Sequence, residues 1–373
     1  MNAGKCEVLV NARFLTQTLT GVQRYSLELV KALDGLLDRG AINSERYSLL
    51  LLAPSSTKGH GLKRIPLKRV GRLGGTLWSQ LELSRHARSG VLWSPANAGP
   101  IHHERHVVTI HDASVLDHPE WFSARFAAWY RFLLPRLAKN AVRILTVSEF
   151  SRRRLAETLA MDPERISVVP NGVDTRFKPV QPDAAEGVLK RLGLPRDYVL
   201  ALGSLEPRKN LGGLLSAWSL LLSRKAIDGD VHLVVAGGKS SLFRDAGLSS
   251  LPDRVVLTGY VTDEDLPALY SGALAFVYPS LYEGFGLPPL EAMACGVPVV
   301  ANDSTSIPEV VGNAALLVDP HETESIAEGL RSVLGDADLR ASLRTAGLER
   351  VKMFSWDDSA RLVWKHLAEV ADN

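Results

Sequence analysis

The sequence predicts an α/β protein made of two doubly wound parallel-sheet domains. Short apolar runs rich in Val, Ile and Leu alternate with longer helical patterns along the chain, and polar residues do not interrupt these runs at every second position. Uninterrupted apolar runs are typical of strands buried on both faces, as in a parallel sheet covered by helices. The 373 residues exceed one ordinary core and suit two domains of about 150 to 200 residues each.

The expected elements form two series. A helix is expected over 22–37, where apolar residues recur at helical spacing. In the first series the expected strands are 6–12, 47–53, 91–95, 106–112, 143–148 and 166–170. In the second series they are 198–204, 231–238, 254–260, 274–280, 297–303 and 314–320. The polar, proline-containing stretch 179–187 separates the two series, so we predict a domain boundary at residue 180.

Composition excludes several classes of protein. With 46% apolar and 23% charged residues, the chain suits a soluble globular fold rather than a disordered one. Cys6 and Cys295 stand far apart without a second ligand at metal spacing, so neither a disulfide framework nor a zinc site is expected. No run reaches the roughly 18 to 20 apolar residues of a membrane span, and the first residues lack a signal-peptide pattern. We therefore expect a cytoplasmic protein.

The net charge of +2 conceals two oppositely charged halves. Residues 1–180 carry 26 Lys and Arg against 15 Asp and Glu, a net charge of +11, whereas residues 181–373 carry 17 against 26, a net charge of −9. A basic half is expected to meet an anionic partner. Charge alone leaves nucleic acid, a membrane surface and a phosphorylated substrate open as that partner.

The most informative segment follows the expected strand 274–280. The loop 283–286 reads Glu-Gly-Phe-Gly, Pro288 or Pro289 suits the first position of a helix, and Glu291 falls in its first turn. Loop glycines let backbone amides approach a ligand closely, and a helix N-terminus attracts phosphate. Each glutamate alone also suits an exposed charge or a complement to the helix dipole. Because carboxylates are good acceptors for sugar hydroxyls, the combination favours a ligand that carries both phosphate and sugar.

The string EGFGLPPLEAMACGVPVV, with its glutamates in the spacing E-x7-E, resembles the signature of retaining nucleotide-sugar glycosyltransferases of the GT-B fold, specifically glycosyltransferase family 4. Other segments along nearly the whole chain resemble blocks of that family in the family's order: TGVQRY, TIHD, LTVSEFSRRRL, PNGVD, GSLEPRKNL, LTGYV and FSWDDSA. The resemblance implies two Rossmann-like domains that face a cleft. Residues 1–180 would bind the acceptor, 181–354 would bind the donor, and 355–373 would form a helix that packs back on the first domain.

The resemblance also implies roles for residues of the second domain. Glu291 would hold the ribose hydroxyls of the donor, and Glu283 would contact hydroxyls of the donor sugar. Arg208 and Lys209 would hold the diphosphate, where fixed cations stabilise the charge of the leaving group; alone they would suit a solvated pair at a helix start. The remaining donor contacts would come from Gly203, Ser204, Tyr260, Val261, Gly284, Phe285, Gly286 and Leu287. Many family members have arginine where Ser204 stands, and whether Arg208 replaces it stays open.

Two segments of the first domain are assigned to the site in the same way. Gly21 and Val22 open the first expected helix, where the resemblance lets donor phosphate or acceptor approach the backbone. His111 follows the expected strand 106–112 and would contact the donor sugar near the reacting carbon. Taken alone, the glycine equally suits a turn and the histidine a structural role. Ser148 and Ser151 are expected to cap a helix.

A metal ion is not expected. Asp228-Gly229-Asp230 has the D-x-D spacing by which other glycosyltransferases hold a divalent ion, but it precedes an expected strand instead of following one. We therefore interpret it as a turn. Because Arg208 and Lys209 supply the cationic role, we expect neither metal nor cofactor.

These inferences predict a retaining glycosyltransferase. No carboxylate stands out as a covalent nucleophile, so the expected mechanism is a same-face substitution through an oxocarbenium-like transition state. The alternatives are a nucleotide-sugar epimerase or phosphorylase of the same fold, or a non-catalytic nucleotide-sugar-binding protein. A Rossmann dehydrogenase is disfavoured, since no G-x-G-x-x-G follows the first expected strand.

Substrate and location are inferred from the same resemblance. The segment 11–33 and the block GSLEPRKN resemble mannosyl- and rhamnosyltransferases of bacterial surface-polysaccharide and O-antigen synthesis, so the expected donor is GDP-mannose and the expected acceptor a lipid-linked glycan. The basic half would then meet an anionic membrane surface on the inner face of the cytoplasmic membrane, as a peripheral protein, and not nucleic acid. The expected contact segments are 58–72, where apolar residues separate the charges, and 152–154.

Overall fold

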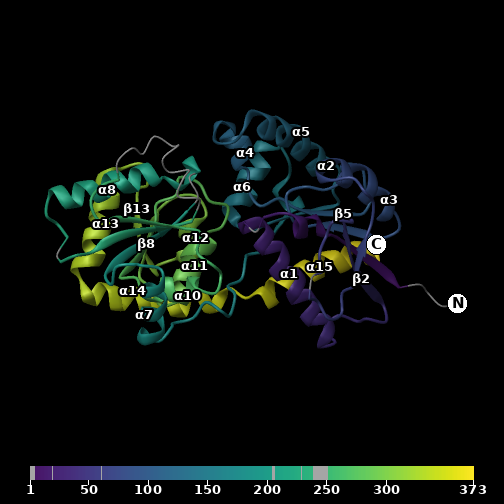
Figure 1. Cartoon of the computed structure of the whole chain (residues 1–373). Coiled ribbons are helices and arrows are strands. Elements are labelled where there is room, and N and C mark those ends of the chain that lie inside the picture. The colour runs from purple at the N-terminus through teal and green to yellow at the C-terminus, as the bar shows by residue number, and fades with distance from the viewer. Residues whose placement is uncertain (1–4, 19, 60, 204–205, 228, 238–250) are drawn as a thin grey trace. The chain divides into compact units, whose positions relative to one another are not determined.

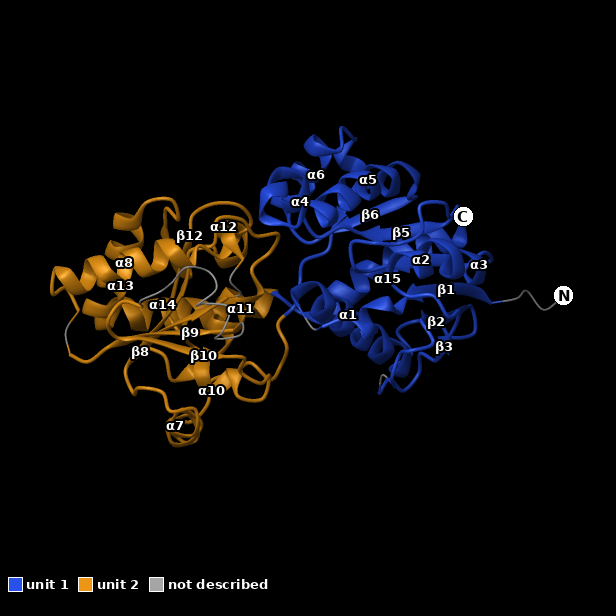
Figure 2. Ribbon diagram, turned by 45° about the horizontal axis from the view of Figure 1, so that its top comes forward, with its two compact units in different colours: residues 1–172, 354–373 blue, residues 173–353 orange. Residues whose placement is uncertain are grey.

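The structure, a computed structural model, describes residues 5–18, 20–59, 61–203, 206–227, 229–237 and 251–373 (Figure 1). The chain divides into two compact units, one formed by 1–172 with 354–373 and the other by 173–353 (Figure 2). Each unit is a parallel sheet covered by helices, as the sequence predicts.

The first unit contains a seven-stranded sheet in the order β3-β2-β1-β4-β5-β6-β7, in which all pairs are parallel. Its strands are β1 (Cys6–Asn11), β2 (Tyr47–Ala53), β3 (Leu67–Arg69), β4 (Val91–Ser94), β5 (His106–Thr109), β6 (Arg143–Thr146) and β7 (Ile166–Val168). Its helices are α1 (Gly21–Asp38), α2 (Gly75–Leu77), α3 (Ser84–His86), α4 (Ser114–Asp117), α5 (Ala124–Asn140), α6 (Glu149–Thr158) and α15 (Trp356–Asp372). The short edge strand β3 was not among the expected strands.

The second unit contains a six-stranded parallel sheet in the order β10-β9-β8-β11-β12-β13. Its strands are β8 (Tyr198–Leu202), β9 (His232–Ala236), β10 (Val255–Gly259), β11 (Ala275–Tyr278), β12 (Val299–Asn302) and β13 (Ala315–Val318). Its described helices are α7 (Pro182–Arg191), α8 (Leu211–Ser223), α10 (Leu266–Ser271), α11 (Leu287–Ala294), α12 (Ile307–Val311), α13 (Thr323–Gly335) and α14 (Ala337–Arg350).

The sheet of the second unit is buried on both faces. Along β8, Tyr198 and Leu200 belong to one hydrophobic cluster, whereas Val199 and Ala201 belong to a second cluster on the other face. Successive side chains of a strand point to opposite faces, so a strand covered on both sides needs an apolar residue at every position. This burial explains why the apolar runs in the sequence lack a polar residue at every second position.

Helix α1 forms over the stretch expected from its spacing of apolar residues. Tyr25, Leu29 and Leu33 are buried, and they recur at the three- to four-residue spacing of one helix face. The C-terminal helix α15 lies beside α1 and contacts β1 and β4 (Figures 1 and 2). Its N-cap is Ser355, whose hydroxyl accepts from the amide of Asp358. The final helix therefore packs on the first unit.

The strand order of each sheet reverses at one point. In the first unit the reversal lies between β1 and β4, and in the second between β8 and β11. The connections after two such strands run to opposite sides, which leaves a crevice at the carboxyl ends where doubly wound proteins bind ligands. Except for Tyr260 and Val261, which follow β10, the expected site residues of the second unit follow β8 and β11, so the reversal brings them together.

The units divide at 172 and again at 353, whereas the sequence analysis placed the boundaries at 180 and 354. Residues 173–180 belong to the second unit, and two of their apolar side chains pack in or against its core. Val173 packs against that core, and the ring of Phe177 lies 5.9 Å from the ring of Tyr270 at an angle of 77°.

The central apolar residue of segment 58–72, the first expected membrane contact, is buried. Ile65 is only 1% exposed. The carboxylate of Asp34 accepts hydrogen bonds from the backbone amides of Lys63, Arg64 and Ile65, at 2.9, 2.8 and 2.7 Å, and so holds the segment against α1. Its charges remain exposed, but its central apolar residue packs into the protein.

The second expected membrane contact, residues 152–154, is partly neutralised by acidic neighbours. In the second basic segment, Arg152 pairs with Glu149 at 2.8 Å and Arg154 with Asp117 at 2.6 Å, so two of its three charges already have acidic partners. Within the described ranges, we find no helix with the length and apolar character that a transmembrane crossing requires.

Candidate active site

Two loops meet at the carboxyl ends of β8 and β11. Arg208 and Lys209 lie in a 3₁₀ turn after β8, and Glu283 lies in the loop after β11. The carbonyl of Arg208 accepts from the amide of Leu281 at 2.7 Å, which joins the two loops directly. The turn ends at Asn210, whose left-handed backbone (φ 54°) leads into α8 and whose side chain donates to the carbonyl of Pro320.

Glu283 is the centre of a buried polar cluster. Its Oε1 lies 2.6 Å from the ammonium group of Lys209 and 2.8 Å from the donating hydroxyl of Tyr278. Its Oε2 lies 3.2 Å from Nη1 of Arg208. The ammonium of Lys209 also donates to the hydroxyl of Tyr278 over 2.6 Å, so the three groups form a closed triangle.

The charges of this cluster are strongly coupled. Burial alone would raise the pKa of Glu283, but the cations of Lys209 and Arg208 and the hydroxyl of Tyr278 lower it to about 2. Burial lowers the pKa of Lys209, and Glu283 opposes that effect. The pKa of Tyr278 is well above its ordinary value because the ring is buried and faces the Glu283 carboxylate. At neutral pH the carboxylate is therefore an ionised hydrogen-bond acceptor and a weak base.

The second glutamate lies on the helix that follows. Helix α11 begins at Leu287, one residue before the first proline, and its N-cap Gly286 has a φ of +118° that disfavours other residues. Glu291 is 7% exposed, and its Oε2 accepts from the hydroxyl of Tyr270 at 3.1 Å. The hydroxyl of Ser306 donates to the carbonyls of residues 283 and 285, which holds the loop before the helix.

In the first unit, His111 follows β5 and is 6% exposed. Its Nε2 lies 2.9 Å from the carbonyl of Pro95, and because a carbonyl only accepts, Nε2 carries the proton. Burial lowers the pKa of this histidine, although Pro95 and Asp112 act in the opposite direction. The neutral ring lies edge-on against Tyr25, 4.5 Å between centroids, and its Nδ1 is left as a hydrogen-bond acceptor.

Comparison with known proteins assigns both units to described families. Residues 190–350 match the family described as Glycosyl transferases group 1, and residues 19–177 match Glycosyltransferase Family 4. A protein of Escherichia coli named O-antigen chain mannosyltransferase B is 34% identical over 371 residues, which cover 91% of this chain and 93% of that protein. The chain belongs to glycosyltransferase family 4.

Other comparisons agree with this assignment. The O-antigen chain mannosyltransferase RfbU of Salmonella typhimurium is 27% identical over 97% of this chain and 99% of its own length. Anabaena HepE, solved in complex with UDP and glucose, superposes with a TM-score of 0.73 at 18% identity, covering 98% of this chain and all of that one. WaaG, a glycosyltransferase of lipopolysaccharide biosynthesis, superposes with a TM-score of 0.70 at 16% identity, covering 96% and 98%. These structural likenesses show the GT-B fold with its two Rossmann-like domains.

In this glycosyltransferase, the carboxyl ends of β8, β9 and β10 lie side by side. Gly203 follows β8 and its amide donates to the carbonyl of Ala236. After β9, Gly237 has a φ of +114°, and an added Cβ would lie 2.7 Å from the carbonyl oxygen of Gly203. After β10, Tyr260 is 77% exposed and Val261 is buried. The predicted donor contact Ser204 lies outside the described residues.

At the start of α1, neither backbone conformation nor packing requires a glycine. An added Cβ at Gly21 would have no neighbour within 4 Å, and the adjoining Val22 is half-buried. The alternative interpretation as a tight turn thus receives no steric support. The predicted cap is confirmed, since the hydroxyl of Ser148 accepts from the amide of Ser151 at 3.0 Å.

The D-x-D segment is described only in part. Asp228 lies outside the described residues, Gly229 has a φ of +70°, and Asp230 is exposed beside Arg254. Across the ranges that the structure describes, we find no group of three His, Cys, Asp or Glu side chains that is arranged to hold a metal ion.

Two tyrosines of the site, Tyr278 and Tyr270, were not predicted from the sequence. Each supplies a hydroxyl to one of the two predicted glutamates. Their signal in the sequence is weak, because a tyrosine within an apolar run equally indicates core packing. Gly237 was also not predicted, although the two glycines that end the expected strand 231–238 could have indicated a close approach of two loops.

Proposed function

We propose that this glycosyltransferase transfers mannose from GDP-mannose, with retention of anomeric configuration, to a lipid-linked or oligosaccharide acceptor in O-antigen synthesis. The observation that carries the proposal is the contact of Glu283 with Lys209 and Arg208 at the strand-order reversal of the second unit. Two cations suit a diphosphate, and a carboxylate beside them suits sugar hydroxyls. The names of the relatives that align over nearly the whole chain support the acceptor and the mannosyl group.

The ionisation of Glu283 favours a same-face substitution over a covalent intermediate. A carboxylate with a pKa of about 2 that accepts from three donors is a poor nucleophile and a poor base. In the proposed step the bond from the anomeric carbon to the phosphate oxygen breaks while the bond to the acceptor oxygen forms. The acceptor proton then passes to the departing phosphate oxygen, whose charge Lys209 and Arg208 stabilise.

Neutral His111 would accept a hydrogen bond through Nδ1. With its Nε2 proton directed to Pro95, the ring offers an acceptor to a hydroxyl of the donor sugar. Glu291 would hold the ribose hydroxyls through Oε1, while its Oε2 stays bonded to the hydroxyl of Tyr270. No metal ion is required in this scheme, since Arg208 and Lys209 supply the positive charge.

A donor screen tests the function. Wild-type protein would be incubated with GDP-mannose, UDP-glucose, UDP-N-acetylglucosamine or GDP-rhamnose and a lipid-linked or oligosaccharide acceptor, with and without chelator. We expect transfer from GDP-mannose that survives chelation, and an NMR spectrum that shows retained configuration. Loss of turnover on chelation would contradict metal independence. An isomerised sugar nucleotide with its diphosphate intact would identify an epimerase, and tight binding without turnover would identify a binding protein.

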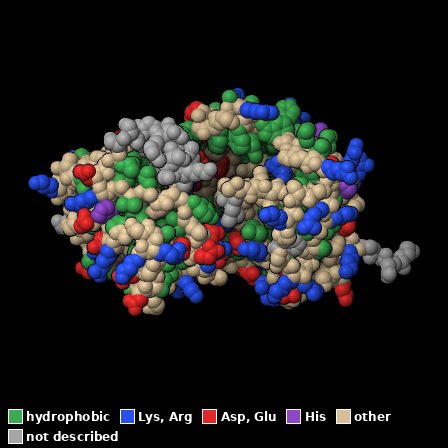
Figure 3. Space-filling model, in the orientation of Figure 1, with side chains coloured by type: hydrophobic (Ala, Val, Ile, Leu, Met, Phe, Trp, Pro, Cys, Tyr) green, Lys and Arg blue, Asp and Glu red, His purple; other side chains and the backbone are tan. Residues whose placement is uncertain are grey.

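We also propose that the protein associates peripherally with an anionic membrane surface through its first unit. This unit would bind the acceptor, which is lipid-linked in this proposal. Helix α5 supports this proposal, because it carries four basic residues and no Asp or Glu. Phe126 and Phe132 are each 43% exposed on it, and Arg136 lies 3.7 Å from the ring of Phe132. Figure 3 shows hydrophobic and basic side chains mixed where Figure 1 places α5. Aromatic rings with flanking cations suit a bilayer interface.

Co-sedimentation with vesicles tests the association. We expect binding to vesicles rich in phosphatidylglycerol, no binding to pure phosphatidylcholine, and loss of binding as salt rises. Phe126→Ser with Phe132→Ser should weaken binding, whereas Leu362→Ser, which changes an exposed apolar residue on α15, should not. Absence of binding at low ionic strength would contradict the proposal.

A further inference from the structure

Each of the two glutamates is bonded to a buried tyrosine. Tyr278, the last residue of β11, donates to Oε1 of Glu283 over 2.8 Å, and Tyr270, in α10, donates to Oε2 of Glu291 over 3.1 Å. Tyr270 is fully buried and Tyr278 is 2% exposed. The two tyrosines thus contact the site from inside the core.

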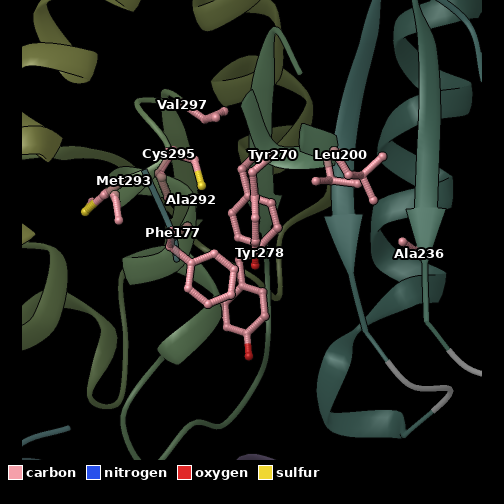
Figure 4. Close-up of a cluster of buried hydrophobic side chains, with 14 of the residues drawn as sticks. Phe177, Leu200, Ala236, Tyr270, Tyr278, Ala292, Met293, Cys295 and Val297 are labelled. Carbon is pink, nitrogen blue, oxygen red and sulfur yellow. The ribbon is translucent and has the colours of Figure 1, made fainter. Parts of the chain in front are cut away.

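The two rings belong to one aromatic column. Phe276 lies between them, 5.4 Å from the ring of Tyr270 and 5.8 Å from the ring of Tyr278. Phe177 closes the column, 5.9 Å from Tyr270. In Figure 4 the rings of Phe177, Tyr270 and Tyr278 lie close together, and both tyrosine hydroxyls are at the lower end of their rings. A ring in such a close-packed interior cannot turn away without displacing its neighbours.

Packing alone does not explain the hydroxyls. Phe276 fills a neighbouring core position of the same strand without a hydroxyl, so phenylalanine would satisfy the column. A buried hydroxyl is costly unless it is bonded, and both of these hydroxyls are bonded to a glutamate. The hydroxyl of Tyr278 also accepts from Lys209 over 2.6 Å, so it contacts both charged partners.

We infer that Tyr278 and Tyr270 are positioning residues of the active site: Tyr278 fixes the Glu283 carboxylate against Lys209, and Tyr270 fixes the Glu291 carboxylate on α11. The inference rests on the proposed function, in which Glu283 meets the donor sugar and Glu291 the ribose. A misplaced Glu283 therefore weakens contacts at the reacting sugar and lowers kcat. A misplaced Glu291 weakens binding of the nucleotide.

Three phenylalanine variants test this inference. Tyr278→Phe and Tyr270→Phe each remove one hydroxyl and keep the ring in the column. Tyr198→Phe is the matched control, because Tyr198 is equally buried and its hydroxyl donates to the backbone carbonyl of Leu269 over 2.6 Å. Tyr270→Phe and Tyr198→Phe each lose one buried hydrogen bond, and Tyr278→Phe loses two, so thermal unfolding should report losses of stability of the same order.

Kinetics on the donor that the wild type uses best should separate the variants. We expect Tyr278→Phe to lower kcat about tenfold or more with little change in donor KM, as for a hydrogen bond to a charged group that matters in the transition state. Tyr270→Phe should weaken nucleoside diphosphate binding, measured by calorimetry, by about tenfold with a smaller change in kcat. The control should keep wild-type kcat and KM.

A double-mutant cycle on the transfer rate measures the coupling between Tyr278 and Glu283, which a general loss of stability would not produce. The effects of Tyr278→Phe and Glu283→Gln on the transfer rate should be non-additive, whereas those of Tyr198→Phe and Glu283→Gln should add. An active wild type with additive effects, or with Tyr278→Phe and Tyr270→Phe indistinguishable from the control, would overturn the inference. A wild type that neither binds GDP or UDP nor turns over any donor would instead overturn the proposed function.

Discussion

The ammonium group of Lys209 lies 2.6 Å from Oε1 of Glu283, although 74 positions separate the two residues in the chain. The contact exists because β8 and β11 are neighbours in the sheet, and each residue follows the carboxyl end of one of these strands. Both side chains are largely buried, with 13% and 9% of their surface exposed. A buried pair of this kind is weak evidence of stability, so its cost suggests a function.

Removal of the Lys209 cation should slow transfer strongly. Lys209→Ala leaves Glu283 buried with one cation and removes a charge that would stabilise the leaving diphosphate, so we expect kcat to fall by about a hundredfold or more. Lys190→Ala is the control, since this lysine is 75% exposed and pairs with Glu186 on the surface of α7. Steady-state rates for both variants check the prediction. Wild-type activity in Lys209→Ala would contradict the site assignment.

The free energy of unfolding of the protein should depend on pH through the ionisation of Glu283. Its folded pKa of about 2 lies below the unfolded value of about 4.3, so its contribution to the free energy of unfolding is present above pH 5 and is lost as the pH falls towards 2. Urea unfolding of the wild type and Glu283→Gln should therefore give a difference that shrinks between pH 5 and pH 2.

Glu186→Gln is the control for this pH series, because the Glu186 carboxylate is exposed beside Lys190 and should contribute little at any pH. A difference between wild type and Glu283→Gln that stays constant down to pH 2 would show that Glu283 is not held ionised by its partners.

The loop before α11 should not tolerate a side chain at Gly286. The residue has a φ of +118°, and an added Cβ would lie 2.5 Å from Cδ1 of Ile307. We expect Gly286→Ala to destabilise the fold by about 1–3 kcal/mol and to reduce donor binding through displacement of the loop. Gly187→Ala, within α7 and free of neighbours, should instead stabilise by about 0.5–1 kcal/mol. Thermal unfolding that ranks the two variants in the opposite order would contradict this account.

The variant Gly21→Ala tests whether this glycine is needed for a ligand contact or for a turn. Because an added Cβ meets nothing within 4 Å, Gly21→Ala should not lower the melting temperature. If donor phosphate or acceptor approaches this backbone, the same variant should raise the KM of that substrate severalfold. Unchanged stability together with unchanged kinetics would remove Gly21 and Val22 from the site.

Much of the fold could be predicted from local patterns. Every expected strand is present within a few residues, because burial on both faces of a parallel sheet requires uninterrupted apolar runs. The edge strand β3 escaped detection, since its three residues are half-buried or exposed and carry two charges. The local pattern of 58–72 did not reveal that Ile65 is buried, because the Asp34 carboxylate on α1 binds the backbone amide of that residue.

The sequence by itself determined the family and the chemical character of the site. The spacing of Glu283 and Glu291 around a glycine loop and a helix start is local, so it is readable along the chain. Only the tertiary structure decided the partners of these glutamates. Tyr278, Tyr270 and Lys209 reach them through strand neighbours and helix packing that no local pattern specifies. The protonation of Glu283 depends in turn on those partners, because burial and nearby cations act on its pKa in opposite directions.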